Sequence, residues 1–166
     1  MTLEESYNET GPKIVGYLVA TGTDEATALD LLHDAVVRVA RWLEENSPPD
    51  NLPSLLFTTA RNLRANRVRH DARIDFVGDV REDEVRQPES DAHLSTSDAA
   101  YLRNRIAVAL RELPEAQREA YVLYQIGGRS VREVAEMTGA GESLVKVRIH
   151  RAKKSLRKSL ADWKER

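Results

Sequence analysis

The chain has 166 residues, with 25 Lys or Arg against 27 Asp or Glu, so its formal net charge is −2. This length fits one ordinary domain or two small ones, and 41% apolar with 31% charged residues fits a soluble helical chain. The absence of cysteine excludes disulfides, thiolate metal sites and a cysteine nucleophile. Because apolar runs are short and the acidic N-terminus does not resemble a signal peptide, we expect a cytoplasmic protein without membrane insertion.

The small net charge hides a strong segregation of charge along the chain. Residues 1–60 carry a net −7, residues 61–73 a net +4, residues 74–100 a net −6 and residues 143–166 a net +7. Two compact basic blocks separated by an acidic one indicate two contact sites for a polyanion. Either block taken alone is equally compatible with the solvated face of a helix.

Residues 1–73 are expected to form a first domain of three or four helices. A weak helix over 3–20 contains Pro12, which we expect to kink or split it. Thr23 is the expected N-cap of a second helix that runs to about Glu45. Its spacing predicts one buried apolar stripe, formed by Leu32, Ala35, Val36, Val39 and Leu43.

A proline-rich segment over 47–53 separates this helix from a third. Ser54 is the expected N-cap of the third helix, which runs to about Arg73. Residues 74–98 then lose periodicity, and their Gly, Pro, Ser and acidic content predicts a flexible acidic linker. The expected buried side of the third helix consists of Leu55, Leu56, Thr59, Ala60 and Leu63.

Residues 99–166 are expected to form a second helical domain. Pro114 suits the first position of its second helix, and the glycine pair at 127–128 ends that helix. Its first helix carries an apolar stripe formed by Leu102, Ile106, Ala109, Leu110 and Leu113. Since no strand pattern competes with these helices, the predicted fold class is all-α, with two small helical domains joined by the linker.

The end of the chain has the outline of a helix-turn-helix. Ser130 and Glu133 have the spacing of a capping box, and Gly139 suits a turn with positive φ. A final helix over 142–158 is expected to bury Val145, Ile149, Ala152 and Leu156. The residues left on its outward face to meet base edges and phosphates are Glu142, Ser143, Lys146, Val147, Arg148, His150 and Arg151. A basic amphipathic helix that only solvates the domain is the alternative.

The second domain strongly resembles domain 4 of bacterial extracytoplasmic-function (group IV) sigma factors. The resemblance rests on Leu-x-x-Leu-Pro at 110–114, Ser-x-x-Glu-Val-Ala at 130–135, and Val-Lys-Val-Arg-Ile-His-Arg-Ala at 145–152. It implies that the seven residues named above read the −35 promoter element. Gly141, Leu144 and Val147 depart from the family pattern, and these departures bear on which −35 sequence is read.

The first domain resembles domain 2 of the same family in two places. Residues 28–39 are similar to the helix that docks on the β′ coiled coil of RNA polymerase, which implies that Asp30, Asp34 and Arg38 bind core polymerase. Because surface charges are weak signals, an exposed carboxylate pair stabilised by Arg38 is the alternative. A metal site is disfavoured, since no third ligand is spaced to join the two carboxylates.

Residues 55–73 resemble the family's −10 recognition helix. Four polar side chains recur there at i, i+4, i+7 and i+11, which makes one stripe able to touch bases and phosphates. In the loop before it, Asn51 could help to hold a flipped base or could be a plain turn residue. The residues assigned to −10 recognition are Asn51, Arg61, Asn62, Asn66, Arg69 and Arg73.

The sequence therefore predicts an alternative sigma factor, not an enzyme, with no cofactor and no metal. Its implied partners are core RNA polymerase, through the β′ coiled coil and the β flap, promoter DNA and an anti-sigma factor. One alternative is a sigma-like decoy in anti-sigma partner switching, motivated by departures from the family pattern at Leu29, Leu55, Asn66 and Val147. Another is a helix-turn-helix repressor acting without polymerase, which leaves the first domain unexplained.

Overall fold

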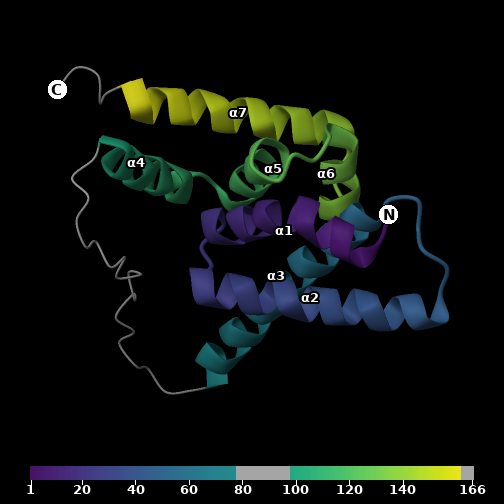
Figure 1. Ribbon diagram of the computed structural model, residues 1–166. Coiled ribbons are helices and arrows are strands. Elements are labelled where there is room, and N and C mark those ends of the chain that lie inside the picture. The colour runs from purple at the N-terminus through teal and green to yellow at the C-terminus, as the bar shows by residue number, and fades with distance from the viewer. Residues whose placement is uncertain (78–97, 162–166) are drawn as a thin grey trace. The chain divides into compact units, whose positions relative to one another are not determined.

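The computed structural model describes residues 1–77 and 98–161, and in this part of the chain the regular secondary structure consists of α-helices (Figure 1). Its helices are α1 (Leu3–Ala20), α2 (Glu25–Glu45), α3 (Leu52–Val77), α4 (Asp98–Glu112), α5 (Glu115–Gln125), α6 (Val131–Thr138) and α7 (Glu142–Ala161). The predicted all-α fold class is confirmed. Most of the predicted linker lies outside the described residues. None of the helices described has the length and apolar composition needed to cross a bilayer.

Contacts between the helices divide the chain into two compact units. The first unit holds the N-terminal half of α1 with α2 and α3, whereas the second holds residues 12–25 together with α4 to α7. The division of the sequence into domains at 1–73 and 99–166 stays a prediction. Each unit is described below by itself.

Helix α1 runs without interruption through Pro12, so the expected split at this proline is wrong. The side chains of Ile14, Tyr17 and Leu18, which follow the proline, are completely buried. Burial of this apolar surface outweighs the local cost of about 3 kcal/mol for an internal proline. Thr2 and Glu5 form a reciprocal capping box at its start, and the hydrogen bond from the Thr2 amide lowers the pKa of the Glu5 carboxyl.

The first unit packs α2 and α3 through the stripes that periodicity predicts. Leu32, Ala35 and Val39 of α2 are buried, as are Leu56 and Ala60 of α3. The other expected core positions are only partly buried, namely Val36, Leu43, Leu55, Thr59 and Leu63. Phe57 is fully buried although the sequence stripe omitted it.

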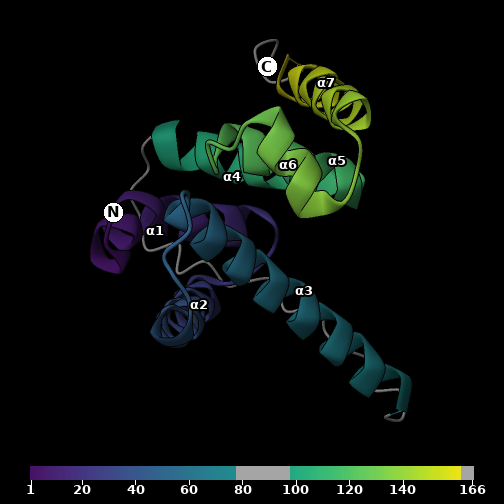
Figure 2. The same cartoon turned by 90° about the vertical axis from the view of Figure 1, so that its right-hand side faces the viewer.

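Helix α3 begins earlier than predicted, and a different residue caps it. The Asn51 side-chain oxygen accepts a hydrogen bond from the Ser54 amide at 3.0 Å, so Asn51 and not Ser54 is the N-cap. Pro53 then lies in the first helical turn, where its missing N–H costs nothing because first-turn amides have no intrahelical partner. Figure 2 shows α3 as one long helix that continues to Val77, beyond the expected end at Arg73.

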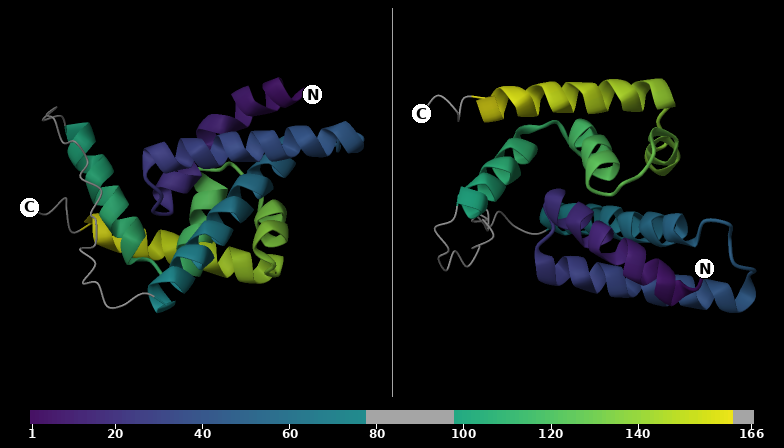
Figure 3. Two further views of the ribbon diagram at one scale, coloured as in Figure 1. Left: turned by 90° about the horizontal axis from the view of Figure 1, so that it is seen from below. Right: turned by 45° about the horizontal axis from the view of Figure 1, so that its top comes forward.

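In the second unit, the long helix α7 packs against α4, α5 and α6 (Figure 3). Ala109 and Leu110 of α4 and Leu113, which follows the helix, are buried as predicted, but Leu102 and Ile106 of α4 are exposed. The predicted stripe is therefore covered only toward the C-terminal end of α4. Pro114 is the N-cap of α5, not its first helical residue, because its ψ of 141° is extended and the helix begins at Glu115.

Candidate nucleic-acid interface

Local hydrogen bonds fix the start of α6, the first helix of the helix-turn-helix. The Ser130 hydroxyl accepts a hydrogen bond from the Glu133 amide at 3.2 Å, and the Glu133 carboxylate accepts one from the Ser130 amide at 2.8 Å. This is the capping box that the sequence predicts, and the structure confirms it. It satisfies two amides that the first turn of a helix otherwise leaves without partners.

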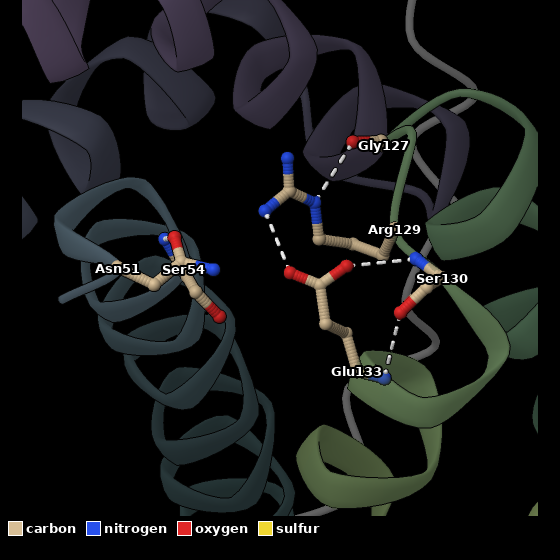
Figure 4. Close-up of polar contacts among 6 residues, drawn as sticks. All are labelled: Asn51, Ser54, Gly127, Arg129, Ser130 and Glu133. Atoms are coloured by element: carbon tan, nitrogen blue, oxygen red, sulfur yellow. Dashed lines mark hydrogen bonds and ion pairs between the residues drawn. The ribbon is translucent and has the colours of Figure 1, made fainter.

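The same carboxylate also holds a buried arginine, which sequence reasoning missed. Arg129 is only 8% exposed; its Nη1 lies 3.4 Å from Glu133 Oε1 and its Nε donates to the Gly127 carbonyl at 3.2 Å. Figure 4 shows the Glu133 carboxylate between Arg129 and Ser130. A buried guanidinium requires such partners because desolvation of an unpaired charge is costly. The i, i+4 spacing of Arg129 and Glu133 was the available sequence signal.

The turn between α6 and α7 depends on a left-handed glycine. Gly139 is the C-cap of α6 with a φ of 70°, a conformation that glycine adopts without the Cβ penalty. On either side of the turn, Val134 and Ala135 of α6 and Val145 and Ile149 of α7 are buried. The crossing of the two helices is therefore fixed by packing on one side of each helix.

Because Val145, Ile149, Ala152 and Leu156 are all buried, α7 has one face in the core and one toward solvent. Six of the seven residues predicted for −35 recognition are exposed, and Arg148 is half-buried. Further cations on the solvent side are Lys154, Arg157 and Lys158. Lys153 differs, since its ammonium group lies 5.3 Å from the centre of the Tyr124 ring of α5. The outward face of α7, defined here as residues 142–151 on the solvent side, combines short polar residues with cations.

A second basic surface lies on α3. The four residues of the predicted polar stripe are exposed, namely Asn62, Asn66, Arg69 and Arg73. Arg61 is half-buried. Arg69 donates through Nη2 to the Asn66 side-chain oxygen at 2.5 Å, which holds two members of the predicted stripe side by side. Asn51 is also exposed, but its carboxamide oxygen caps α3. The structure thus gives Asn51 a local structural role whether or not it also meets a base.

The acidic face of α2 has the exposure that a docking surface requires. Asp30, Asp34 and Arg38 are all exposed. Beside them, a largely apolar groove of about 470 Å³ lies between α1 and α2, lined by Leu3, Glu4, Tyr7, His33, Val36 and Val37. Within the described ranges, no cluster of His, Asp or Glu has the arrangement of a metal site.

A helix-turn-helix whose second helix presents a cationic outward face defines a DNA-binding protein. The family model for Sigma-70, region 4 matches residues 103–156, which include this motif. The chain is 30% identical over 159 residues to the RNA polymerase sigma factor CarQ of Myxococcus xanthus, covering 96% of this chain and 89% of CarQ. It is 29% identical over 147 residues to the ECF RNA polymerase sigma factor EcfG of Rhodopseudomonas palustris, covering 87% and 77% of the two chains.

Two solved structures share the fold. One is the sigma factor RpoE of Bartonella quintana in complex with the anti-sigma factor NepR, with a TM-score of 0.71, 23% identity, and coverage of 95% of this chain and 96% of that one. The other is CnrH in complex with the cytosolic domain of CnrY, with a TM-score of 0.67, 22% identity, and coverage of 96% and 88%. These structures show the fold, and the 30% identity to CarQ over most of both chains shows that the chain belongs to the ECF RNA polymerase sigma factor family. It is an alternative sigma factor that directs promoter-specific transcription initiation by RNA polymerase.

Proposed function

We propose that this sigma factor reads the −35 element with the outward face of α7. The observation that carries this assignment is the division of α7 into a buried apolar stripe and an exposed cationic face. Burial fixes the orientation of the helix, and exposure leaves Lys146 and Arg151 available to phosphates and base edges. The seven residues assigned to the −35 element are Glu142, Ser143, Lys146, Val147, Arg148, His150 and Arg151.

The −10 element is assigned to α3. Its exposed Asn and Arg stripe offers amides for base edges and guanidinium groups for phosphates. The Arg69–Asn66 hydrogen bond supports this role, because it aligns an amide with a cation on one face. The set proposed for this element is Asn51, Arg61, Asn62, Asn66, Arg69 and Arg73.

Core RNA polymerase is proposed to bind through two surfaces. Asp30, Asp34 and Arg38 on the exposed face of α2 are assigned to the β′ coiled coil. The β flap is assigned to the second unit, where an apolar groove of about 510 Å³ lies between α5 and α7. Neither role requires chemistry from the chain, because polymerase binding and base capture supply the free energy for promoter opening.

An anti-sigma factor is the proposed regulator. RpoE, whose fold is similar, was solved in complex with the anti-sigma factor NepR, and CnrH was solved in complex with the cytosolic domain of CnrY. A decoy that never reaches DNA has no need of exposed cations on both α3 and α7, and both helices carry them. The exposed cations therefore favour an active sigma factor over a decoy.

The test is run-off transcription with purified core RNA polymerase and fragments of the organism's own genome. We expect discrete transcripts that require this chain, and promoter complexes whose stability falls steeply with salt. Core polymerase without the chain is the control. If no fragment supports transcription although the chain binds core polymerase, the decoy alternative replaces the proposed function. If the free chain binds a specific duplex as tightly as the holoenzyme does, a repressor acting alone is favoured.

A further inference from the structure

Two large apolar side chains lie exposed near the start of the DNA-reading helix. Leu144 is 46% exposed and Val147 is 42% exposed, although both belong to α7. They are three residues apart, so they are neighbours on the helix surface. The buried stripe formed by Val145, Ile149, Ala152 and Leu156 lies on the other side of the helix. Packing within the unit therefore does not account for their apolar character.

Their position and surroundings indicate the kind of partner they meet. Lys146, Arg148 and Arg151 flank the pair along the helix, and these charges repel a second copy of the same surface. A polyanion that also offers an apolar group complements such a surface. Duplex DNA has this chemistry, since the major groove carries the C5 methyl group of thymine between its phosphate backbones.

The two side chains also differ from their neighbours in the groups of a base pair that they can recognise. Leu144 and Val147 have no side-chain donor or acceptor, so they cannot pair with the hydrogen-bonding groups of a base edge. A polar base edge pressed against them would lose its water without gaining a partner, which is unfavourable. A thymine methyl gains by the same burial. Val147 is also β-branched, and its restricted χ1 reduces the entropy lost on contact.

We propose that Leu144 and Val147 are specificity-determining residues that select thymine methyl groups in the −35 element. The proposal rests on the proposed function, since it requires α7 to enter the major groove there. It adds Leu144 to the reading face and gives Val147 a definite preference. The −35 element of this sigma factor accordingly contains at least one thymine, on either strand, facing the N-terminal half of α7.

The experiment uses the holoenzyme on a promoter recovered by run-off transcription. Each thymine of the −35 region, on both strands, is replaced singly by uracil, which removes the methyl group and keeps every hydrogen-bonding atom. Burial of one methyl group predicts that promoter binding weakens about three- to fourfold at one or two positions. At the remaining thymines, binding is expected to stay unchanged.

Variants then connect the methyl group to the side chains. In Val147→Ser or Leu144→Ala holoenzyme, the ratio of thymine to uracil binding is expected to fall to about one at the matching position. The matched control is Val108→Ser, which changes a valine of α4 with 41% exposure in the same unit and is expected to keep the wild-type ratio. Equal melting temperatures of all variants show that the fold is kept.

The outcomes separate this inference from the function on which it rests. Transcription from promoters that tolerate uracil at every position, or that carry no thymine in the −35 region, overturns the inference and leaves the sigma-factor function standing. A thymine preference that persists unchanged in both variants also overturns it. Absence of any transcription overturns the proposed function and this inference together.

Discussion

The two basic helices α3 and α7 are built differently although both are assigned to DNA. Helix α7 buries an apolar stripe along most of its length, from Val145 to Leu156. In α3 the buried positions stop at Ala60, and residues 66–74 are exposed on every side. A helix that is polar all round gains little from packing and depends on local interactions such as the Arg69 bonds to Asn66 and Ala65.

The difference fits two kinds of proposed DNA target. Helix α7 is packed against the rest of its unit along most of its length, which suits the reading of a regular duplex groove. The C-terminal half of α3 has little packing within its unit, so we expect contact with polymerase and DNA to contribute to its order.

Lys146→Ala combined with Arg151→Ala is expected to weaken holoenzyme binding to a promoter about a hundredfold. Loss of two charge-assisted contacts accounts for this magnitude, and the salt dependence of log K should fall by about two. The measurement is promoter affinity as a function of salt concentration. The matched control is Arg103→Ala with Arg111→Ala, two exposed arginines of α4. A control that lowers affinity as much as the test variant would refute the assignment of α7.

Glu133→Ala is expected to lower the free energy of unfolding of the helix-turn-helix unit by about 2 kcal/mol or more. The change removes one half of the capping box and the ion pair between Glu133 and the buried Arg129. Glu136→Ala is the matched control, because its ion pair with Arg132 is exposed and contributes about 0.5 kcal/mol at most. Denaturant unfolding measures both, and equal effects would show that the Arg129 network does not stabilise α6.

Asp34→Arg is expected to weaken binding to core polymerase about tenfold while the melting temperature is kept. Reversing a charge at a complementary interface is unfavourable on both sides of the contact, and Asp34 is exposed in the free chain. Pull-down and titration with core polymerase measure the effect. Glu45→Arg, at the far end of the same helix, is the control. Normal core binding by Asp34→Arg would remove this residue from the docking surface.

Asn51→Ala is expected to destabilise the start of α3 by about 1 kcal/mol, the usual contribution of a side-chain N-cap. Asn51→Asp keeps a capping oxygen and serves as the conservative variant. If Asn51 also reads a base, Asn51→Asp will retain stability and lose −10 preference in transcription assays. Equal loss of stability in both variants would contradict the capping role.

Local sequence signals predicted the elements of the helix-turn-helix well. Ser130 and Glu133 form the predicted capping box at the start of α6, and Gly139 has the predicted positive φ at its end. Periodicity also predicted the buried stripe of α7. These features depend on near neighbours in sequence, which is why the sequence alone was enough to find them.

Features that depend on distant packing were predicted less well. Leu102 and Ile106 have the helical spacing of a buried stripe but are 38% and 37% exposed. Pro12 stays inside α1 because the residues that follow it are buried, which local propensity does not reveal. Arg129 is charged and would be expected at the surface, yet its pairing with Glu133 allows burial. The site assignments on α2, α3 and α7 stay predictions that the experiments above test.

We propose that α7 and α3 meet two different elements of one promoter within the polymerase holoenzyme. Photo-crosslinkers placed at His150 of α7 and at His70 of α3, both exposed, would locate each helix on a promoter of known start site. We predict crosslinks from His150 to the −35 region and from His70 near the −10 region, each requiring core polymerase. Crosslinks at exchanged positions, or equal crosslinks without polymerase, would contradict the account.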